Sequence, residues 1–439
     1  MEKRNNMNND KKIINQLVNK IKSQGYKKIC FWMPSVAVNG GVHYMCKLAK
    51  YFDENTSLEV YYMDYKDGYA RAILNETNVK FLDYIEEEVK FSIKEPCIIF
   101  VNSTRVIQLK NMNPKNKVLF WHWETARCAW DKLLLRNETS KLLKLIKNQK
   151  AMIFHDWSSR NILNRQFNTG FKNKSYLSMV IDKKDIIADP SSFINEDEIN
   201  IAWIGRISTD KVYALYNIID NLANYKTKKI KVLHIIGDGL RYEDLKKYVK
   251  KYSKQIVFKL VGIIPNEQLG DYLINNADIV FAMGLSAIES ASIRIPTAVV
   301  LLDTKPFKTE DFFWLFDTRE YCVGITPEQK TDYNVKYTKF KTMIDEVFEC
   351  GHKKQIANKT YDYYIDNFSD FNAVMIRFLT YIIKCSLTAD KIRDCIRYMP
   401  YSLIRVTTKK FLNRVLSEKV EFNGQVDKYV NGKLKTKKS

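Results

Sequence analysis

Short apolar runs alternate with stretches of helical periodicity along this chain, and the alternation occurs twice. The first series predicts strands at 28–33, 58–63, 79–82, 97–101, 117–121 and 151–154, and the second at 199–204, 231–236, 257–260, 279–283 and 297–302. Strands that are each followed by a helix form a parallel sheet with helices on both faces. We therefore predict an α/β protein with two Rossmann-like parallel-sheet domains.

The two series are separated by a polar, acidic stretch at 182–198, which we interpret as the linker between the domains. The length of 439 residues suits two domains of ordinary size. The predicted organisation is a polar segment and helix at 1–27, one α/β domain at 28–190, a second at 191–365, and helices with a basic tail at 366–439. We expect the two sheets to face each other across a cleft, where substrates commonly bind.

The chain is strongly basic, with 71 Lys and Arg against 50 Asp and Glu and a net charge of +21. Such a charge favours polyanionic partners: nucleic acid, an anionic membrane surface or a phosphorylated substrate. The eight cysteines include no Cys-x-x-Cys pair and mostly lie in apolar runs, which indicates reduced thiols in a cytoplasmic protein. Because the sequence shows neither a signal-peptide core nor an apolar run of membrane-spanning length, we expect neither secretion nor a membrane span.

The C-terminal stretch 384–439 holds fourteen Lys or Arg and five acidic residues. Aromatic residues such as Tyr398 and Phe411 are interleaved with Arg397 and Lys409. A basic amphipathic helix that lies on anionic lipid has this pattern, which predicts peripheral attachment to the inner membrane surface from the cytoplasmic side. The alternative is a solvated helix that packs on the first domain and is followed by a disordered end.

Two cations follow the strand predicted at 199–204. The apolar run stops at Gly205, Arg206 comes next, and Lys211 precedes the following helix. Ligands of open α/β sheets bind at the carboxyl ends of the strands. An arginine and a lysine there suit a diphosphate, one through bidentate contact and the other as a point charge. The alternative is a pair of solvated surface charges.

Gly40 and Gly41 lie between the first predicted strand and a helix predicted at 42–52. The first N–H groups of a helix are free, and glycine lets a ligand approach the backbone closely. This loop is therefore a candidate anion or sugar site, and a simple turn is the alternative.

Three further loops of the second series carry glycine or acidic residues. They are His234-Ile-Ile-Gly237-Asp-Gly239, Leu260-Val-Gly262-Ile-Ile-Pro265 and Gly284-Leu-Ser-Ala-Ile-Glu289. Together with Gly205-Arg206 and Lys211, in this order and spacing, they resemble the motifs of retaining, GT-B-type glycosyltransferases of glycosyltransferase family four (glycosyl transferases group 1). The resemblance covers about residues 28–370 and is strongest at 199–300.

The resemblance implies a nucleotide-sugar donor held mainly by the second domain, with its diphosphate as the leaving group. Arg206 and Lys211 match the phosphate-binding pair that acts in catalysis, and His122 matches a histidine near the transferred sugar. Glu289 matches the carboxylate that binds the ribose hydroxyls, and the loop 261–264 matches the segment whose backbone contacts the base. The other donor-binding positions that it implies are Gly40, Gly41, Gly237, Gly262, Ile263, Leu285, Ser286 and Ala287.

Two of these residues have an ordinary structural alternative, and one position departs from the family. Glu289 could be an acid that stabilises the start of its helix. His122 lies between Trp121 and Trp123 and could simply pack among its neighbours. The family also has a glutamate eight residues before the ribose-binding one, where this chain has Phe281. The usual contact with the hydroxyls of the donor sugar is then missing or made by another residue.

No Asp-x-Asp motif is present, so we expect no metal and no cofactor besides the donor. The resemblance then implies retaining transfer in which the leaving phosphate helps to deprotonate the acceptor hydroxyl. We predict a bacterial hexosyltransferase that builds a surface polysaccharide, such as capsule or O-antigen, on a saccharide or lipid-linked acceptor. One alternative is a sugar-nucleotide epimerase of the same fold, for which we find no set of cleft acids. The other is a non-catalytic, basic nucleic-acid-binding protein, for which we find no binding module.

Overall fold

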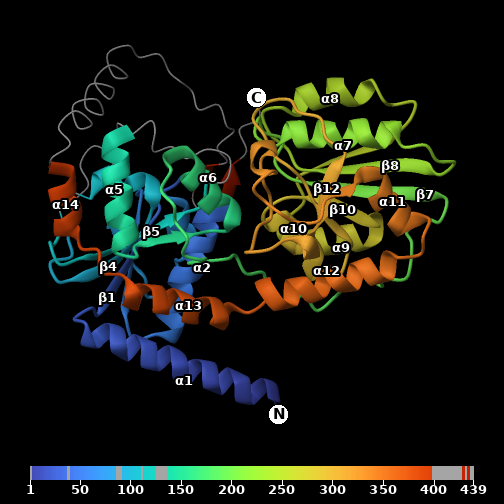
Figure 1. Cartoon of the computed structure of the whole chain (residues 1–439). Coiled ribbons are helices and arrows are strands. Elements are labelled where there is room, and N and C mark those ends of the chain that lie inside the picture. Colours follow the sequence, from blue (N-terminus) through green and yellow to red (C-terminus); the bar gives the residue numbers. More distant parts are fainter. Residues whose placement is uncertain are drawn as a thin grey trace. The chain divides into compact units, whose positions relative to one another are not determined.

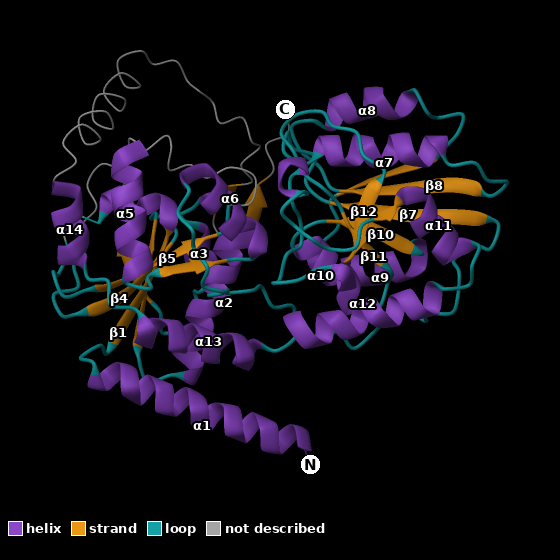
Figure 2. Cartoon of the chain, in the orientation of Figure 1, coloured by secondary structure: helices purple, strands orange, loops and turns teal. Residues whose placement is uncertain are grey.

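The computed structural model describes residues 2–36, 40–85, 91–109, 112–124, 136–397, 428–430 and 433–435 (Figure 1). The chain forms two compact units. The first comprises Met1–His155, Ser159–Leu177 and Asn372–Ser439, and the second comprises Asp156–Ser158 and Ser178–Phe371. In each unit helices lie on both faces of a sheet (Figure 2), which is the predicted α/β architecture.

The first unit is built on a six-stranded sheet in the order β3-β2-β1-β4-β5-β6, in which every neighbouring pair is parallel. Its strands are β1 (Lys28–Trp32), β2 (Glu59–Asp64), β3 (Lys80–Asp83), β4 (Cys97–Asn102), β5 (Lys117–His122) and β6 (Met152–Phe154). Lys28 of β1 is paired with Glu59 on one side and Cys97 on the other. The strand order therefore reverses beside β1, and this switch point is where an open sheet offers a ligand crevice.

Helices cover this sheet. They are α1 (Glu2–Ser23), α2 (Gly40–Asn55), α3 (Tyr69–Ile73), α5 (Arg136–Asn148), α6 (Trp157–Phe167), α13 (Phe371–Lys384) and α14 (Ala389–Arg397). All residues of β4 and β5 are buried, which explains why these strands are unbroken apolar runs in the sequence. Helix α13 belongs to this core because the ring of Phe378 lies 5.7 Å from that of Phe52 and 4.6 Å from that of Phe100.

The second unit contains a seven-stranded sheet in the order β13-β12-β11-β10-β7-β8-β9. Its strands are β7 (Glu198–Ile204), β8 (Ile230–Ile236), β9 (Val257–Gly262), β10 (Ile279–Ala282), β11 (Thr297–Val299), β12 (Asp311–Trp314) and β13 (Thr338–Lys339). Strands β7 to β11 are parallel to one another, and the order reverses between β7 and β10. The antiparallel strands β12 and β13, of four and two residues, are not predicted from the sequence.

The helices of the second unit are α7 (Val212–Asn224), α8 (Tyr242–Lys250), α9 (Asn266–Asn276), α10 (Leu285–Ser292), α11 (Phe340–Phe348) and α12 (Lys353–Phe368). This unit includes residues 178–190, which the sequence assigns to the first domain. The Ile181 N–H donates to the Phe368 carbonyl at 3.0 Å, and the Ala188 N–H donates to the Ile293 carbonyl at 2.9 Å. The predicted boundaries at 190 and 365 therefore differ from the observed ones, because composition does not reveal such backbone hydrogen bonds.

Most of the predicted basic tail lies outside the described residues. Its described parts are helix α14 and two short antiparallel strands, β14 (Lys428–Val430) and β15 (Lys433–Lys435). The membrane attachment of this tail stays a prediction. In the part of the chain that the structure describes, no helix combines the length and the apolar character needed to cross a membrane.

Candidate functional site

Several of the predicted donor-binding residues of the second unit lie at the carboxyl ends of β7 and β10, and the others follow β8 and β9. Gly205 and Arg206 follow β7 directly, and Lys211 precedes α7. Gly284 follows β10 and begins α10, the helix that carries Glu289. Because β7 and β10 are the neighbouring strands at which the order reverses, these residues lie at the switch point of the sheet.

Backbone hydrogen bonds join the loops that follow β7, β8 and β9. The Gly205 N–H donates to the Ile236 carbonyl at 3.0 Å, and the Gly237 N–H donates to the Gly262 carbonyl at 2.7 Å. Gly237 has a φ of +137°, and a Cβ there would lie 2.1 Å from the Gly205 carbonyl oxygen. Gly239 is similar, with a φ of +153°. These glycines are required for close packing of the loops, and this packing fixes the backbone that carries Arg206.

Arg206 and Lys211 form a pair of neighbouring cations. Arg206 is exposed and Lys211 is half-buried. Burial lowers the pKa of Lys211, and the charge of Arg206 lowers it further, while Asp210 acts in the opposite direction. Neither cationic side chain makes a hydrogen bond or an ion pair within the described residues. Two adjacent positive charges with unused donors form a site that suits a doubly charged anion.

The first turn of α10 adds backbone donors at the same edge of the sheet. Gly284, at the N-cap, has a φ of +62° and donates its N–H to the Val323 carbonyl at 2.8 Å. The Ala287 N–H is bonded to the Gly284 carbonyl at 3.2 Å. The N–H groups of Leu285 and Ser286, by contrast, have no partner in the described part of the chain. A helix N-terminus of this kind attracts phosphate oxygens.

Glu289 lies one helical turn farther along α10 and is half-buried. Burial raises the pKa of Glu289 to about 7, and the charge of the nearby Lys184 acts in the opposite direction by lowering this pKa. No hydrogen bond to its carboxylate is found among the described residues. A carboxylate that is partly removed from water and has no donors of its own suits a ligand with hydroxyl groups. Lys184 is a cation near this site that the sequence does not single out, since it belongs to a polar loop distant in sequence.

The base-binding prediction concerns the loop that follows β9. Val261, Ile263 and Ile264 line a groove of about 380 Å³, together with residues of α9. The side chain of Ile263 is 61% exposed, which is unusual for a large apolar residue. An exposed apolar surface beside the carboxyl end of β9 suits the flat face of a base. Contact between this surface and a base stays a prediction.

Phe281 lies in strand β10 and not in the loop that follows it. Its side chain is fully buried, with ring centroids 5.3 Å from Phe312 and 5.4 Å from Phe340. The strand continues to Ala282, and only Met283 separates it from Gly284. A side chain at position 281 therefore points into the core, and the sugar contact that the family makes there has no counterpart at this position.

In the first unit, Gly40 and Gly41 begin α2 after the carboxyl end of β1, while the preceding Asn39 lies outside the described residues. A Cβ on Gly41 would lie 2.8 Å from the ring of Trp123 and 3.0 Å from the methyl group of Met33. Gly41 is therefore required for the packing of Trp123 against the start of α2. Ligand binding by the two glycines stays a prediction.

His122 is the last residue of β5 and is fully buried. Its Nδ1 lies 2.9 Å from the Ser103 hydroxyl, and burial lowers the pKa of the imidazole to about 3. Its Nε2 is buried without a hydrogen-bond partner among the described residues. The imidazole is therefore neutral and has no exposed surface in this conformation, and contact between His122 and the transferred sugar stays a prediction.

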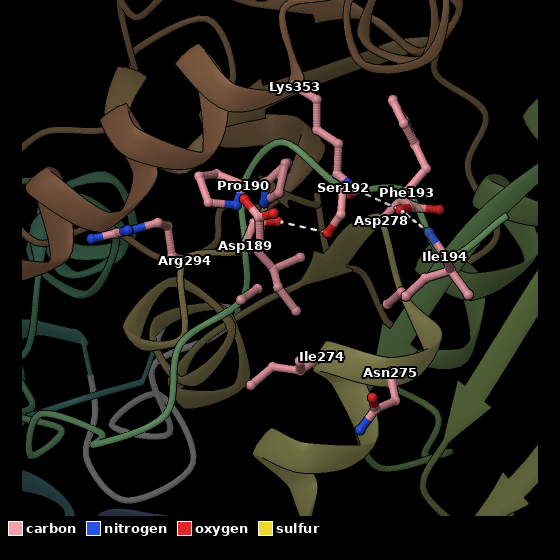
Figure 3. Close-up of a pocket in the computed structure, with 14 residues that line it drawn as sticks. Asp189, Pro190, Ser192, Phe193, Ile194, Ile274, Asn275, Asp278, Arg294 and Lys353 are labelled. Atoms are coloured by element: carbon pink, nitrogen blue, oxygen red, sulfur yellow. Dashed lines mark hydrogen bonds and ion pairs between the residues drawn. The ribbon is translucent and has the colours of Figure 1, made fainter. Parts of the chain in front are cut away.

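A separate cavity of about 400 Å³ lies at the opposite edge of the second sheet (Figure 3). Its lining includes Asp278 and Pro296, which immediately precede β10 and β11. Lys353 extends toward Asp278 in Figure 3, with Nζ 2.5 Å from Oδ1, and both side chains are buried. Lys353 also donates to the Ser192 carbonyl. This ion pair attaches the polar stretch around residue 192 to the sheet, which is a structural role far from the carboxyl ends of the strands.

No three His, Cys, Asp or Glu side chains come together in a way that could hold a metal ion among the residues described here. The charged groups near the switch point of the second unit include Arg206, Lys211 and Glu289.

Comparison with known proteins identifies the fold. No protein-family model and no curated protein sequence matches this chain. The lipopolysaccharide outer core galactosyltransferase WaaB, in its apo form, superposes with a TM-score of 0.50 at 14% identity, over 81% of this chain and 99% of WaaB. HepE of Anabaena, in complex with UDP and glucose, has a TM-score of 0.49 at 11% identity, over 81% and 98% of the two chains. The likeness to WaaB shows that the chain has the GT-B fold, as the resemblance implies.

Proposed function

We propose that the protein is a glycosyltransferase that takes its sugar from a nucleotide-sugar donor. The observation that carries the proposal is the cation pair of Arg206 and Lys211, which lies at the switch point beside the free N–H groups that begin α10. A diphosphate would use both kinds of group. The fold shared with WaaB, a galactosyltransferase, supports the same conclusion.

In this proposal the second unit stabilises the leaving group. Negative charge accumulates on the diphosphate as its bond to the anomeric carbon breaks, and preorganised cations and N–H donors lower the energy of that state. The diphosphate would also raise the pKa of Lys211 again, because a nearby anion favours the charged ammonium. These groups would supply the charge stabilisation that a bound metal ion gives in other transferases.

We further propose that transfer retains the configuration at the anomeric carbon. An oxygen of the departing phosphate would accept the proton of the acceptor hydroxyl while that hydroxyl oxygen bonds to the anomeric carbon on the same face. The motif resemblance from Gly205 to Glu289 supports this assignment. Proton NMR of the first product checks it, since an inverted anomeric coupling would contradict retention.

Glu289 is expected to make donor binding dependent on pH. Its carboxylate would accept hydrogen bonds from the ribose hydroxyls, and it is charged only above its raised pKa of about 7. Affinity for a nucleotide sugar should therefore be highest above pH 7 and about tenfold weaker at pH 6 than at pH 8, since one pKa unit corresponds to a factor of ten. Calorimetric titrations across this range measure the effect.

The nucleotide sugar is the right ligand for this titration, because its two phosphates are both esterified and do not ionise near pH 7. A free nucleoside diphosphate would add its own ionisation at about pH 6. Glu289→Gln serves as the matched control and should bind weakly with little pH dependence. An unchanged pH profile in this variant would remove Glu289 from the donor site.

The proposed pathway role is the assembly of a bacterial surface polysaccharide, with a saccharide or lipid-linked acceptor. The basic and aromatic composition of the tail supports attachment to an anionic membrane surface, where lipid-linked acceptors lie. The full chain should float with anionic vesicles and not with neutral ones, and deletion of residues 392–439 should abolish flotation. Equal flotation of the truncated protein would contradict a membrane role for the tail.

The experiment that tests the function as a whole is a binding screen of the full chain. UDP, GDP, CMP and their common sugars are compared by thermal shift and then by calorimetry. We expect one nucleotide family to raise the Tm of the protein. The corresponding nucleotide sugar should then be consumed when an acceptor extract is added. Absence of binding by every nucleotide would overturn the proposal and leave only the fold.

A further inference from the structure

The loop at residues 182–188 of the second unit is held against helix α10. Two backbone hydrogen bonds fix its ends: the Ile181 N–H donates to the Phe368 carbonyl at 3.0 Å, and the Ala188 N–H donates to the Ile293 carbonyl at 2.9 Å. Phe368 ends α12, a helix that packs against α10, and Ile293 is the C-cap of α10. Because both anchors belong to this pair of helices, the residues between them lie beside α10.

Lys184 is the residue of this loop that comes near Glu289. Glu289 precedes Ile293 by four residues, which is about 6 Å along the axis of α10. Lys184 precedes Ala188 by the same number of residues, and an extended chain of that length spans at most about 13 Å. Burial raises the pKa of Glu289, and the charge of Lys184 acts against this by lowering it. The two side chains are therefore neighbours, although they are distant in sequence.

The two charged groups are complementary to a hydroxyl group. Within the described residues, the side chains of Lys184 and Glu289 form no ion pair with each other and no hydrogen bond to any other group. Lys184 is exposed, and Glu289 is half-buried. An ammonium has only donors and a carboxylate has only acceptors, whereas a hydroxyl can donate to the one and accept from the other. Two adjacent hydroxyls of one ligand would use both groups.

We propose that Lys184 is a donor-binding residue that holds the ribose hydroxyls together with Glu289. The inference rests on the proposed function, because it takes the ribose of a nucleotide to lie at Glu289. It extends that proposal, since Glu289 can only accept hydrogen bonds from the hydroxyls and Lys184 adds a donor to a hydroxyl oxygen. A site built to bind a hydroxyl rejects the analogue that lacks it, so this pair would select ribonucleotides over deoxyribonucleotides.

The test is a calorimetric titration of the full chain at pH 8, where Glu289 is charged. UDP and GDP are compared with their 2′-deoxy and 3′-deoxy analogues. Wild type should bind the ribonucleotide at least about tenfold more tightly than one of the deoxy analogues, because a hydrogen bond to a charged group is lost. Lys184→Met should weaken binding of the ribonucleotide by about three- to tenfold. It should change binding of at least one deoxy analogue by less than twofold, since that analogue lacks the hydroxyl that Lys184 contacts.

Lys183→Met is the matched control for the lost charge. Lys183 is the preceding residue of the same loop, is exposed and makes no ion pair within the described residues. Binding of every nucleotide by this variant should stay within twofold of wild type. Lys184→Arg keeps a positive charge and hydrogen-bond donors, so it should retain most of the wild-type affinity. All three variants should unfold at the wild-type Tm, because both lysines are exposed.

The pH dependence of binding is a second readout, which a purely structural lysine would not change. Helix α10 carries no charged residue besides Glu289 and packs against α9 and α12. No charged group of those two helices shifts the pKa of Glu289 in the described part of the chain, whereas Lys184 lowers it. In Lys184→Met this pKa should therefore rise. Affinity for UDP-glucose or GDP-mannose should then decline at a higher pH than in wild type as the pH falls, and Lys183→Met should follow the wild-type profile.

Three results would overturn the inference, and they are distinguishable. If Lys184→Met binds the ribonucleotide as wild type does and keeps its pH profile, the loop is structural only, and the proposed function is unaffected. If Lys184→Met weakens the ribonucleotide and both deoxy analogues equally, Lys184 acts on the phosphates and not on the ribose. If wild type binds no nucleotide at all, the proposed function fails and this inference fails with it.

Discussion

Replacement of Arg206 by alanine should lower kcat/KM for sugar transfer by about 10²–10³, the effect of removing one group that stabilises charge in a transition state. Lys211→Met should also lower kcat/KM, and the double variant should have a lower kcat/KM than either single variant. Both residues are expected to act on the leaving diphosphate. Steady-state kinetics with the nucleotide sugar and a saccharide acceptor measure the effect.

These variants should remain folded, which makes the kinetic result interpretable. Arg206 is exposed and has no partner among the described residues, so its loss should change the free energy of unfolding by less than about 0.5 kcal/mol. Lys211→Met replaces a half-buried cation by an apolar chain of similar length, which should not destabilise the fold.

The matched control for lost positive charge is Lys247→Ala. Lys247 is exposed on α8 and makes no ion pair within the described residues, so transfer should be unchanged. Arg206→Lys should give an intermediate rate, because an ammonium keeps the charge but lacks the planar fork of the guanidinium. If Arg206→Ala transferred sugar at the wild-type rate, the diphosphate would have to lie elsewhere.

The sequence predicts the parallel part of both sheets because each of those strands is an apolar run followed by a helix. Burial on both faces produces this signal directly, as in β4 and β5. The antiparallel strands β12 and β13 give no such signal. The assignment of 178–190 to the second unit depends on hydrogen bonds to residues more than a hundred positions away, which local composition does not encode.

Part of the candidate site is also predictable from the order of strands and loops along the sequence. Arg206 and the start of α10, the helix that carries Glu289, lie at the same edge of the sheet because β7 and β10 are neighbours, and motif order indicates this without coordinates. Phe281 is different: it lies inside the strand predicted at 279–283, but the strand prediction does not show that its side chain is buried among Phe312 and Phe340. The burial of His122 depends on which side of β5 it faces.

A substitution that adds a single methyl group at Gly237 should disrupt the candidate donor site by displacing the backbone that carries Arg206. In Gly237→Ala the new Cβ would lie 2.1 Å from the Gly205 carbonyl oxygen, and the φ of +137° is unfavourable for alanine. The two effects together should cost about 2–5 kcal/mol, from strain and from overpacking. The Gly205 peptide must then move, which breaks its hydrogen bond to Ile236 and displaces Arg206.

Substitutions at two other glycines of the same unit distinguish backbone strain from overpacking. Gly262→Ala meets no atom within 4 Å at a φ of +77°, so it should cost only the backbone strain of about 1–2 kcal/mol. Gly270→Ala lies inside helix α9, where the nearest contact is an ordinary 3.7 Å to Ile293, and it should stabilise the protein by about 0.5–1 kcal/mol. Urea unfolding of the three variants gives this order if the packing argument is correct.

Nucleotide binding then connects the packing of the loops to function. Gly237→Ala should weaken binding of the nucleoside diphosphate by about tenfold or more at a temperature where the protein is still folded. A tenfold loss of affinity corresponds to a lost interaction worth about 1.4 kcal/mol. Gly270→Ala should bind as wild type does. A Gly237→Ala protein that is destabilised but binds normally would mean that the position of Arg206 does not depend on the β8 loop, and the cation pair would then have to be held by α7 alone.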